Sequence, residues 1–221
     1  AASDVYKRQL TGYLNGTDIK FIRSLTNLQR LDISGARIVE GGDKYYENYL
    51  TADDVTGDYM FYNLPNLTRL VLSNHTTEIA PAALNSCTGL TEMEIPASVK
   101  SVGKAVFNGC NQLLLIDWNA QATITAESFD TPAKMGNLLI FAPEGAECTY
   151  EGNVVIGGIA EKITLTHGKG FRAPQPFKAK DITYKRNFSM YSGNKTDAAG
   201  WEAIALPVSY THLTLPTKRI V

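Results

Sequence analysis

The chain has 221 residues, a formal net charge of −1 and 44% hydrophobic residues, a balance typical of a folded domain. Its weakly acidic composition, without a basic cluster, argues against a nucleic-acid partner. Because a membrane-spanning helix needs roughly 20 consecutive apolar residues and no such run is present, we expect no membrane span in this chain.

The two ends of the chain are related through the genetic code. Residues 1–9 can be encoded by GCAGCGTCAGATGTGTATAAGAGACAG, and the reverse complement of this DNA, in a shifted frame, encodes residues 208–215. Such DNA resembles a transposon-type sequencing adapter, whereas a genuine inverted repeat is the alternative. We therefore predict that residues 1–9 and 208–221 are a sequencing artefact without function, and that the natural start and stop of the protein are missing.

From residue 10 onward the dominant feature is a repeat. Leu67, Leu90 and Leu113 follow one another at intervals of 23 residues, and residues 85–95 align with residues 108–118. This period, with L-x-x-L-x-L spacing, is typical of a leucine-rich repeat solenoid, in which each turn buries its apolar columns against its neighbours. Further columns contain Leu31, Leu70, Met93, Ile116 and Phe141, then Ile33, Leu72, Ile95 and Trp118, and later Phe61, Leu84, Phe107 and Phe129.

The short strand of each turn predicts one outward-facing row. Alternation places Leu70 and Leu72 inward and Val71 outward, and Leu115 is also expected to face outward. Candidate ligand contacts on this basis are Asp32, Val71, Glu94 and Asp117. The alternative is a solvated sheet face, which charged residues form by default.

An insert at about residues 39–60 interrupts the repeat, since the interval from Leu28 to Leu67 is 39 residues. Insertions in solenoids form loops on one face and often carry recognition. The insert contains several tyrosines. Because tyrosine is a rigid, amphipathic contact residue, these side chains could bind a sugar ring or a protein partner. They are Tyr45, Tyr46, Tyr49 and Tyr59. The alternative is that these rings cover the edge of the core.

No residue pattern indicates a metal or disulfide site. Asp53, Asp54 and Asp58 lack the regular spacing of a calcium loop, so we expect an exposed acidic loop. Cys87 and Cys110 share one repeat column and are expected to be buried fillers whose parallel directions disfavour a disulfide.

Catalytic motifs are absent from the sequence as well. His75 and His167 lie in expected turns, and no nucleophile elbow, metalloprotease, phosphate-loop or dinucleotide motif occurs. We therefore predict a non-enzymatic protein with no catalytic residues, no metal and no cofactor.

After Phe141 the period disappears. A hairpin is expected around Gly157 and Gly158, a strand over residues 182–188 and a final strand over residues 201–206. The predicted fold is therefore mainly β, with a leucine-rich repeat solenoid at residues 10–143 followed by a truncated, partial β-rich domain at residues 144–207.

The repeat pattern resembles the BspA-like class of bacterial leucine-rich repeats. The motifs are Phe61, Asn-x-Cys at residues 85–87, and Ile-Pro followed by Val-Gly-x-x-x-Phe at residues 95–107; residues 153–165 and 200–207 resemble segments that follow such repeats in Bacteroidetes-type surface proteins. The resemblance implies a secreted or cell-surface adhesion module that recognises a protein or glycan through the solenoid face and the insert. The alternative is a structural spacer in a larger surface protein whose binding or enzymatic module lies outside this chain.

Overall fold

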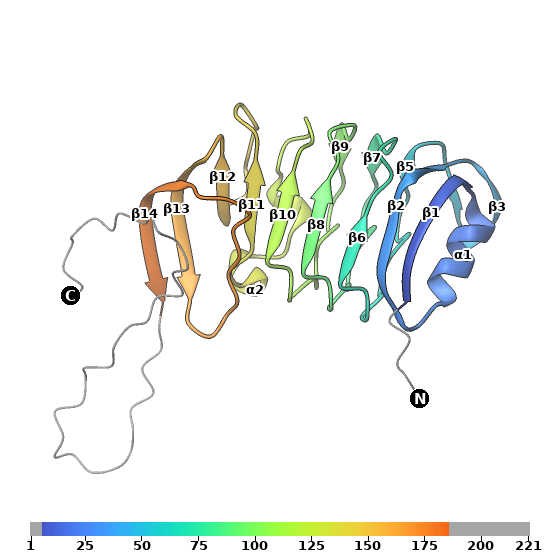
Figure 1. The fold of residues 1–221 in the computed structure, drawn as a ribbon, viewed down its shortest axis with the longest axis horizontal. Coiled ribbons are helices and arrows are strands. Elements are labelled where there is room, and N and C mark those ends of the chain that lie inside the picture. The colour runs from blue at the N-terminus through green and yellow to red at the C-terminus, as the bar shows by residue number, and fades with distance from the viewer. Residues whose placement is uncertain (1–5, 186–221) are drawn as a thin grey trace, which may run out of the picture.

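The computed structural model describes residues 6–185, which form an elongated solenoid with one long sheet along its side (Figure 1). The strand order of this sheet, among the described residues, is β1-β2-β6-β8-β10-β11-β12-β13-β14. Its strands are β1 (Tyr6–Leu14), β2 (Leu28–Ile38), β6 (Arg69–Val71), β8 (Glu92–Ile95), β10 (Leu115–Trp118), β11 (Leu139–Ala142), β12 (Asn153–Ile156), β13 (Ile159–Thr166) and β14 (Lys178–Lys185).

Smaller elements complete the turns. A short parallel sheet contains β5 (Val55–Thr56), β7 (Glu78–Ile79) and β9 (Ser101–Val102), and β3 (Gly41–Tyr46) and β4 (Tyr49–Thr51) form an antiparallel pair. The helices are α1 (Gly16–Ser24), α2 (Pro132–Met135) and a 3-10 turn at Ala126–Ser128. The predicted fold class, a mainly β leucine-rich repeat solenoid, is confirmed.

The predicted leucine columns form the core. Leu67 and Leu90 are fully buried, and Leu70 and Leu72 point inward while Val71 between them is only half-buried. Strands β2, β6, β8 and β10 pair in parallel, so equivalent residues of successive turns stack on one another. Stacking removes from water the apolar surface that a single turn leaves exposed.

The expected position of Phe141 in the inward column is wrong by one residue. Ile140 pairs with Ile116 and is fully buried, whereas Phe141 pairs with the outward residue Asp117. The physical reason is the lead-in to β11, where α2 and the left-handed Gly136 replace the regular turn. As a result the strand begins one residue earlier relative to the leucine column than in the preceding turns.

The side opposite the long sheet repeats its backbone conformation as well as its side chains. Left-handed φ angles recur at intervals of 23 residues at Tyr59, Ala82 and Ala105, and again at Asn63, Ser86 and Gly109. Backbone N–H groups on this side donate to carbonyls one turn further on, for example from Phe61 to Ala83 at 2.8 Å. The turns are therefore connected by hydrogen bonds on both sides, which satisfies backbone groups that packing would otherwise bury unpaired.

Helix α1 is an element that the repeat pattern did not predict. Asn15 and Asp18 form a capping box, in which the Asn15 side chain accepts from Thr17 N at 3.0 Å and Asp18 accepts from Asn15 N at 2.9 Å. The helix buries Ile19 and Ile22 against the core. It lies beside β1 and β2 at the N-terminal end of the solenoid (Figure 1).

The predicted hairpin around Gly157 and Gly158 is confirmed, with both glycines in left-handed conformations and β12 antiparallel to β13. The long sheet continues across the expected boundary at residues 143/144, because β12 also pairs in parallel with β11. The division into two domains stays a prediction. The expected strand at residues 201–206 and the expected artefact at 208–221 lie outside the described residues.

The predicted insert also contains regular structure. Its antiparallel pair, β3 and β4, covers residues 41–51, whereas Val55 and Thr56 pair in register with Glu78 and Ile79 of the next turn. Residues 6–9, which belong to the other expected artefact, are part of β1 and pair in parallel with β2.

Candidate functional site

The long sheet brings the predicted outward residues into one row. Asp32 pairs with Val71, Val71 with Glu94, and Glu94 with Asp117. The carboxylate of Asp32 accepts from Ser34 N and Ser34 Oγ at 2.9 and 2.7 Å. Glu94 is exposed and accepts from Asn119 Nδ2 at 3.2 Å. The row is therefore acidic, but two of its carboxylates already have local partners.

The C-terminal end of this face is covered by the segment that connects β13 to β14, residues 167–177, which we call the strap. Phe171 and Phe177 of the strap pack in one apolar cluster with the outward residues Leu139, Phe141 and Val155. Next to this cluster Leu115 is only 7% exposed, although it faces outward as predicted. Arg172 of the strap also forms an ion pair with Glu92 of β8, so the strap reaches past β10 at this edge of the outward face.

Asp117 differs from the other acidic residues of the row, since burial, followed by the neighbouring charge of Glu94, raises the pKa of its carboxyl. A raised pKa means that ionisation of Asp117 costs stability above the folded-state pKa, and that this cost disappears below the unfolded value near 3.8. We expect Asp117→Asn to raise the Tm at pH 7 and to leave it nearly unchanged at pH 3.

Thermal unfolding followed by circular dichroism at both pH values measures this effect. Glu94→Gln is the matched variant, because it removes only the like charge and should give a smaller gain at pH 7. An equal change in Tm at pH 3 and pH 7 for Asp117→Asn would contradict the electrostatic explanation.

The tyrosines of the insert form one aromatic cluster, but they differ in exposure. Tyr45 is 4% exposed and donates its hydroxyl to Asp58 O at 2.7 Å, so it belongs to the core. Tyr46, Tyr49 and Tyr59 are half-buried and lie with ring centroids 5.4 to 6.0 Å apart where they touch. Tyr62, which the sequence analysis did not single out, packs at 5.4 Å from Tyr59 and 5.7 Å from Tyr46.

Arg23 at the end of α1 holds this cluster in place. Its guanidinium lies 4.5 Å from the centroid of the Tyr46 ring and donates to the carbonyl oxygens of Tyr59 and Met60 at 2.9 Å. Burial lowers the pKa of the guanidinium from its usual value. The repeat pattern could not reveal this residue, because it depends on a helix outside the pattern.

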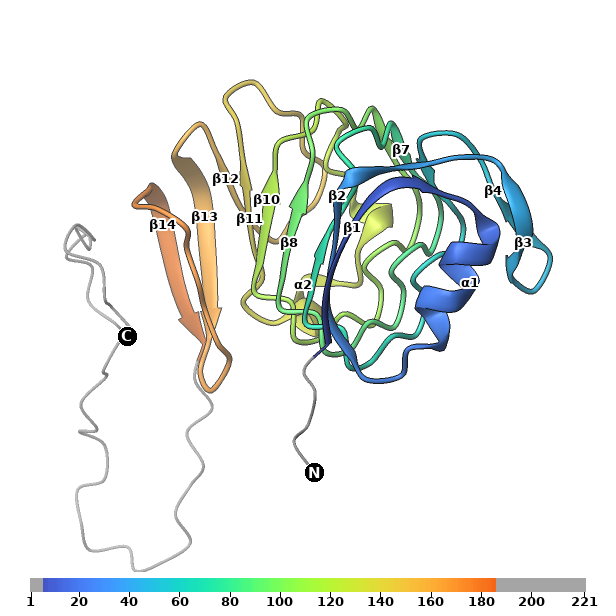
Figure 2. The same cartoon turned by 45° about the vertical axis from the view of Figure 1, so that its right-hand side comes forward.

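The two sets of candidate residues do not form one surface. Figure 2 shows the hairpin of β3 and β4 beyond α1, away from β6, β8 and β10, which carry Val71, Glu94 and Asp117 of the row. We refer to the half-buried rings Tyr46, Tyr49, Tyr59 and Tyr62 as the aromatic cluster from here on.

The remaining candidates have structural partners. Asp54 binds Arg37 through two hydrogen bonds of 2.9 and 2.7 Å, and Asp53 accepts from Glu40 N at 2.9 Å. His75 lies exposed in a turn, and His167 lies 2.6 Å from the hydroxyl of Tyr184. Within residues 6–185 no group of three or more His, Cys, Asp or Glu side chains is placed to hold a metal ion.

The three cysteines are free thiols in the described structure. Cys87 and Cys110 are fully buried in adjacent turns, and their thiols donate to the carbonyl oxygens of Phe61 and Leu84. Burial raises the pKa of the Cys87 thiol to about 11. These two residues are therefore packing residues, as their shared column indicated.

Stacked parallel turns with buried leucine columns define a leucine-rich repeat solenoid. Residues 54–141 match the family model described as a BspA type leucine rich repeat region, in six copies. None of the curated proteins compared with the chain matches it. Solenoids of this kind are typically non-catalytic binding scaffolds, and the family is generally secreted or found at the cell surface. The helices among residues 6–185 are all too short or too polar to cross a membrane.

Proposed function

We propose that this chain is a non-catalytic binding module of a secreted or cell-surface adhesion protein, and that it recognises a protein or glycan. The aromatic cluster is the observation that carries the proposal. Its rings pack against one another and against Arg23, so they are held rigidly while part of each ring stays accessible. Rigid aromatic rings lose little conformational entropy on binding and suit both sugar rings and protein side chains.

The acidic row supports a second contact surface on the open part of the long sheet. Val71 lies between Asp32 and Glu94, which gives this surface a partly apolar centre with charged neighbours. Such a mixture is typical of protein interfaces, where an apolar centre is surrounded by a polar rim. Because the row and the aromatic cluster lie on different parts of the solenoid, each requires its own variant in a binding experiment.

A structural spacer in a larger surface protein is the alternative function. Its support is the local hydrogen bonding of Asp32 and Glu94 and the covering of the outward face by the strap. A spacer needs a stable, polar surface and no ligand, and these features would stabilise one.

A glycan and extracellular-matrix protein array separates the two functions. We expect the full chain to bind at least one ligand class, and Tyr46→Ala combined with Tyr49→Ala to weaken this binding by at least tenfold, since truncating aromatic anchors removes most of their contact area. Tyr45 is left intact in this variant because its ring belongs to the core.

Tyr46→Phe combined with Tyr49→Phe keeps the rings and controls for folding, and Tyr13→Ala controls for loss of an exposed tyrosine elsewhere, as Tyr13 is 74% exposed. Equal binding by the wild type and the double alanine variant removes the aromatic cluster from consideration. If Glu94→Ala also has no effect, or if no ligand binds, the spacer is the better explanation.

A further inference from the structure

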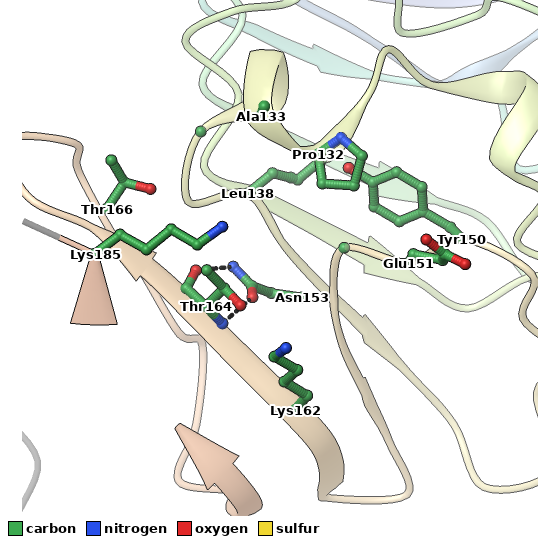
Figure 3. A pocket seen from close by; sticks show the side chains of 12 residues that line it. Pro132, Ala133, Leu138, Tyr150, Glu151, Asn153, Lys162, Thr164, Thr166 and Lys185 are labelled. Atoms are coloured by element: carbon green, nitrogen blue, oxygen red, sulfur yellow. Dashed lines mark hydrogen bonds between the residues drawn. The ribbon is translucent and has the colours of Figure 1, made fainter. Parts of the chain in front are cut away.

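A second candidate site lies at the opposite end of the solenoid from the aromatic cluster. Here α2 and the residues before β12 face the inner side of β13 and β14 across a hollow of about 230 Å³. Figure 3 shows Lys162 and Lys185 reaching toward this hollow from the strands, with Pro132, Leu138 and Tyr150 on the other side. The site is independent of the surfaces in the proposed function.

The hollow exists because β13 separates from β12 soon after the hairpin. Only Ile156 and Ile159 pair between these strands, and further along the Asn153 side chain fills the gap. Asn153 accepts from Thr164 N at 2.6 Å and donates to Thr164 O at 3.0 Å, as a strand backbone would. These two hydrogen bonds, which we call the amide clamp, hold β12 and β13 at a fixed separation. The hollow therefore results from the spacing of the two strands.

Tyr150 contributes its ring and its hydroxyl to one wall of the hollow. The residue is 7% exposed, and its ring is fixed by stacking on Phe129 with centroids 4.5 Å apart and by Gly152, where a Cβ would overlap the ring. Its hydroxyl has no hydrogen bond to another residue of 6–185 and is not one of the fully buried polar atoms, so it stays accessible. An accessible phenolic hydroxyl can donate a hydrogen bond to, or accept one from, a ligand in the hollow.

Two lysines and one glutamate carry the charges around the hollow. Among the described residues, Lys162 and Lys185 take part in none of the ion pairs, and Glu151 is the acidic residue that lines the same space. Two lysines and one glutamate give the site one net positive charge. This suits a ligand with a single carboxylate better than a phosphate monoester, which carries about −1.5 to −2 charges at neutral pH.

The size and the walls indicate the rest of the ligand. A volume of about 230 Å³ is below the roughly 300–1,000 Å³ of pockets for drug-sized molecules, so it fits about one ring. Pro132 and Leu138 offer an apolar surface for the C–H face of the ring, and Thr164 and Thr166 offer hydroxyl groups at the opposite wall. We propose that this hollow binds the ring of an acidic sugar, with its carboxylate at the lysines and a ring hydroxyl at Tyr150.

Calorimetric titration of the full chain with galacturonic acid tests the site. Its methyl ester is the neutral control, and galactose 6-phosphate tests for general anion binding. We expect the acid to bind with a millimolar or lower Kd, and the ester and the phosphate to bind at least tenfold more weakly. Lys162→Gln and Lys185→Gln should each weaken binding of the acid about tenfold, because each removes a charge-assisted contact.

Tyr150→Phe removes only the hydroxyl and should weaken binding several-fold without a loss of Tm. Lys178→Gln, on β14 but outside the hollow, should have no effect. Equal binding of acid and ester, unchanged binding by both lysine variants, or no binding at 10 mM acid would each overturn the proposal. The Tyr46 and Tyr49 variants should bind the acid normally, so failure here is distinct from failure of the proposed function.

Discussion

Trp118→Ala should lower the free energy of unfolding by about 4 kcal/mol, within the roughly 3–5 kcal/mol expected for removing a buried tryptophan. Trp118 has no exposed surface. It is the last residue of the inward column that also contains Ile33, Leu72 and Ile95. Its Nε1 donates to Ala122 O at 3.0 Å, so the alanine also leaves a buried carbonyl unpaired. Urea unfolding followed by far-UV circular dichroism measures the loss.

Two further variants make the Trp118 experiment specific. Trp118→Phe keeps most of the ring volume but not the hydrogen bond, and should cost clearly less than the alanine. Gln121→Ala changes an exposed residue of the same turn and should stay within about 0.5 kcal/mol of the wild type. A loss below 1 kcal/mol for Trp118→Ala would show that the column can collapse around the cavity.

Asn153→Ala should detach the end of the long sheet while the repeats stay folded. The variant removes two hydrogen bonds to the backbone of Thr164 and leaves a partly buried N–H and C=O unpaired, which costs about 2 kcal/mol locally. Hydrogen exchange should show faster exchange at the amides of β13 and β14, with β6, β8 and β10 unchanged, since stability in a solenoid is largely local.

The matched control for Asn153→Ala is Asn137→Ala. Asn137 makes the same kind of clamp, accepting from Thr166 N at 2.7 Å and donating to Thr166 O and Lys169 O at 3.1 and 3.0 Å. It should loosen the strap and the end of β13 rather than the hairpin. Uniformly faster exchange over the whole chain in either variant would show that this end is not a separate unit.

Much of the fold could be predicted because the repeat places equivalent residues in the same surroundings. The interval between Leu67, Leu90 and Leu113 predicted the inward columns, and strand alternation predicted the outward row. The prediction failed at Phe141, where α2 interrupts the regular turn and shifts the strand by one residue. The repeat interval predicts residue positions only in turns of regular length, and the turn that contains α2 is irregular.

The arrangement of the candidate sites was harder to predict from the sequence than the fold. Exposure separates Tyr45 from Tyr46, yet the two are neighbours in the chain and only the β3–β4 register decides which one is buried. Arg23 and Tyr62 join the aromatic cluster from elements that lie far apart in sequence. Asn137 and Asn153 lie in or next to apolar strands, and a buried amide in such a place is the signal that could have indicated the clamps.

The reversal of the chain at Gly157 and Gly158 has a consequence for how this array can grow. New turns of the same length could be accommodated between β6, β8 and β10, because each turn contacts only its immediate neighbours. The edge of β12 is different, because the antiparallel strand β13 pairs with it. The strap covers the outward face of β11 and β12 next to this edge. Duplication of repeats within the gene would therefore lengthen the middle of the solenoid and leave this terminus unchanged.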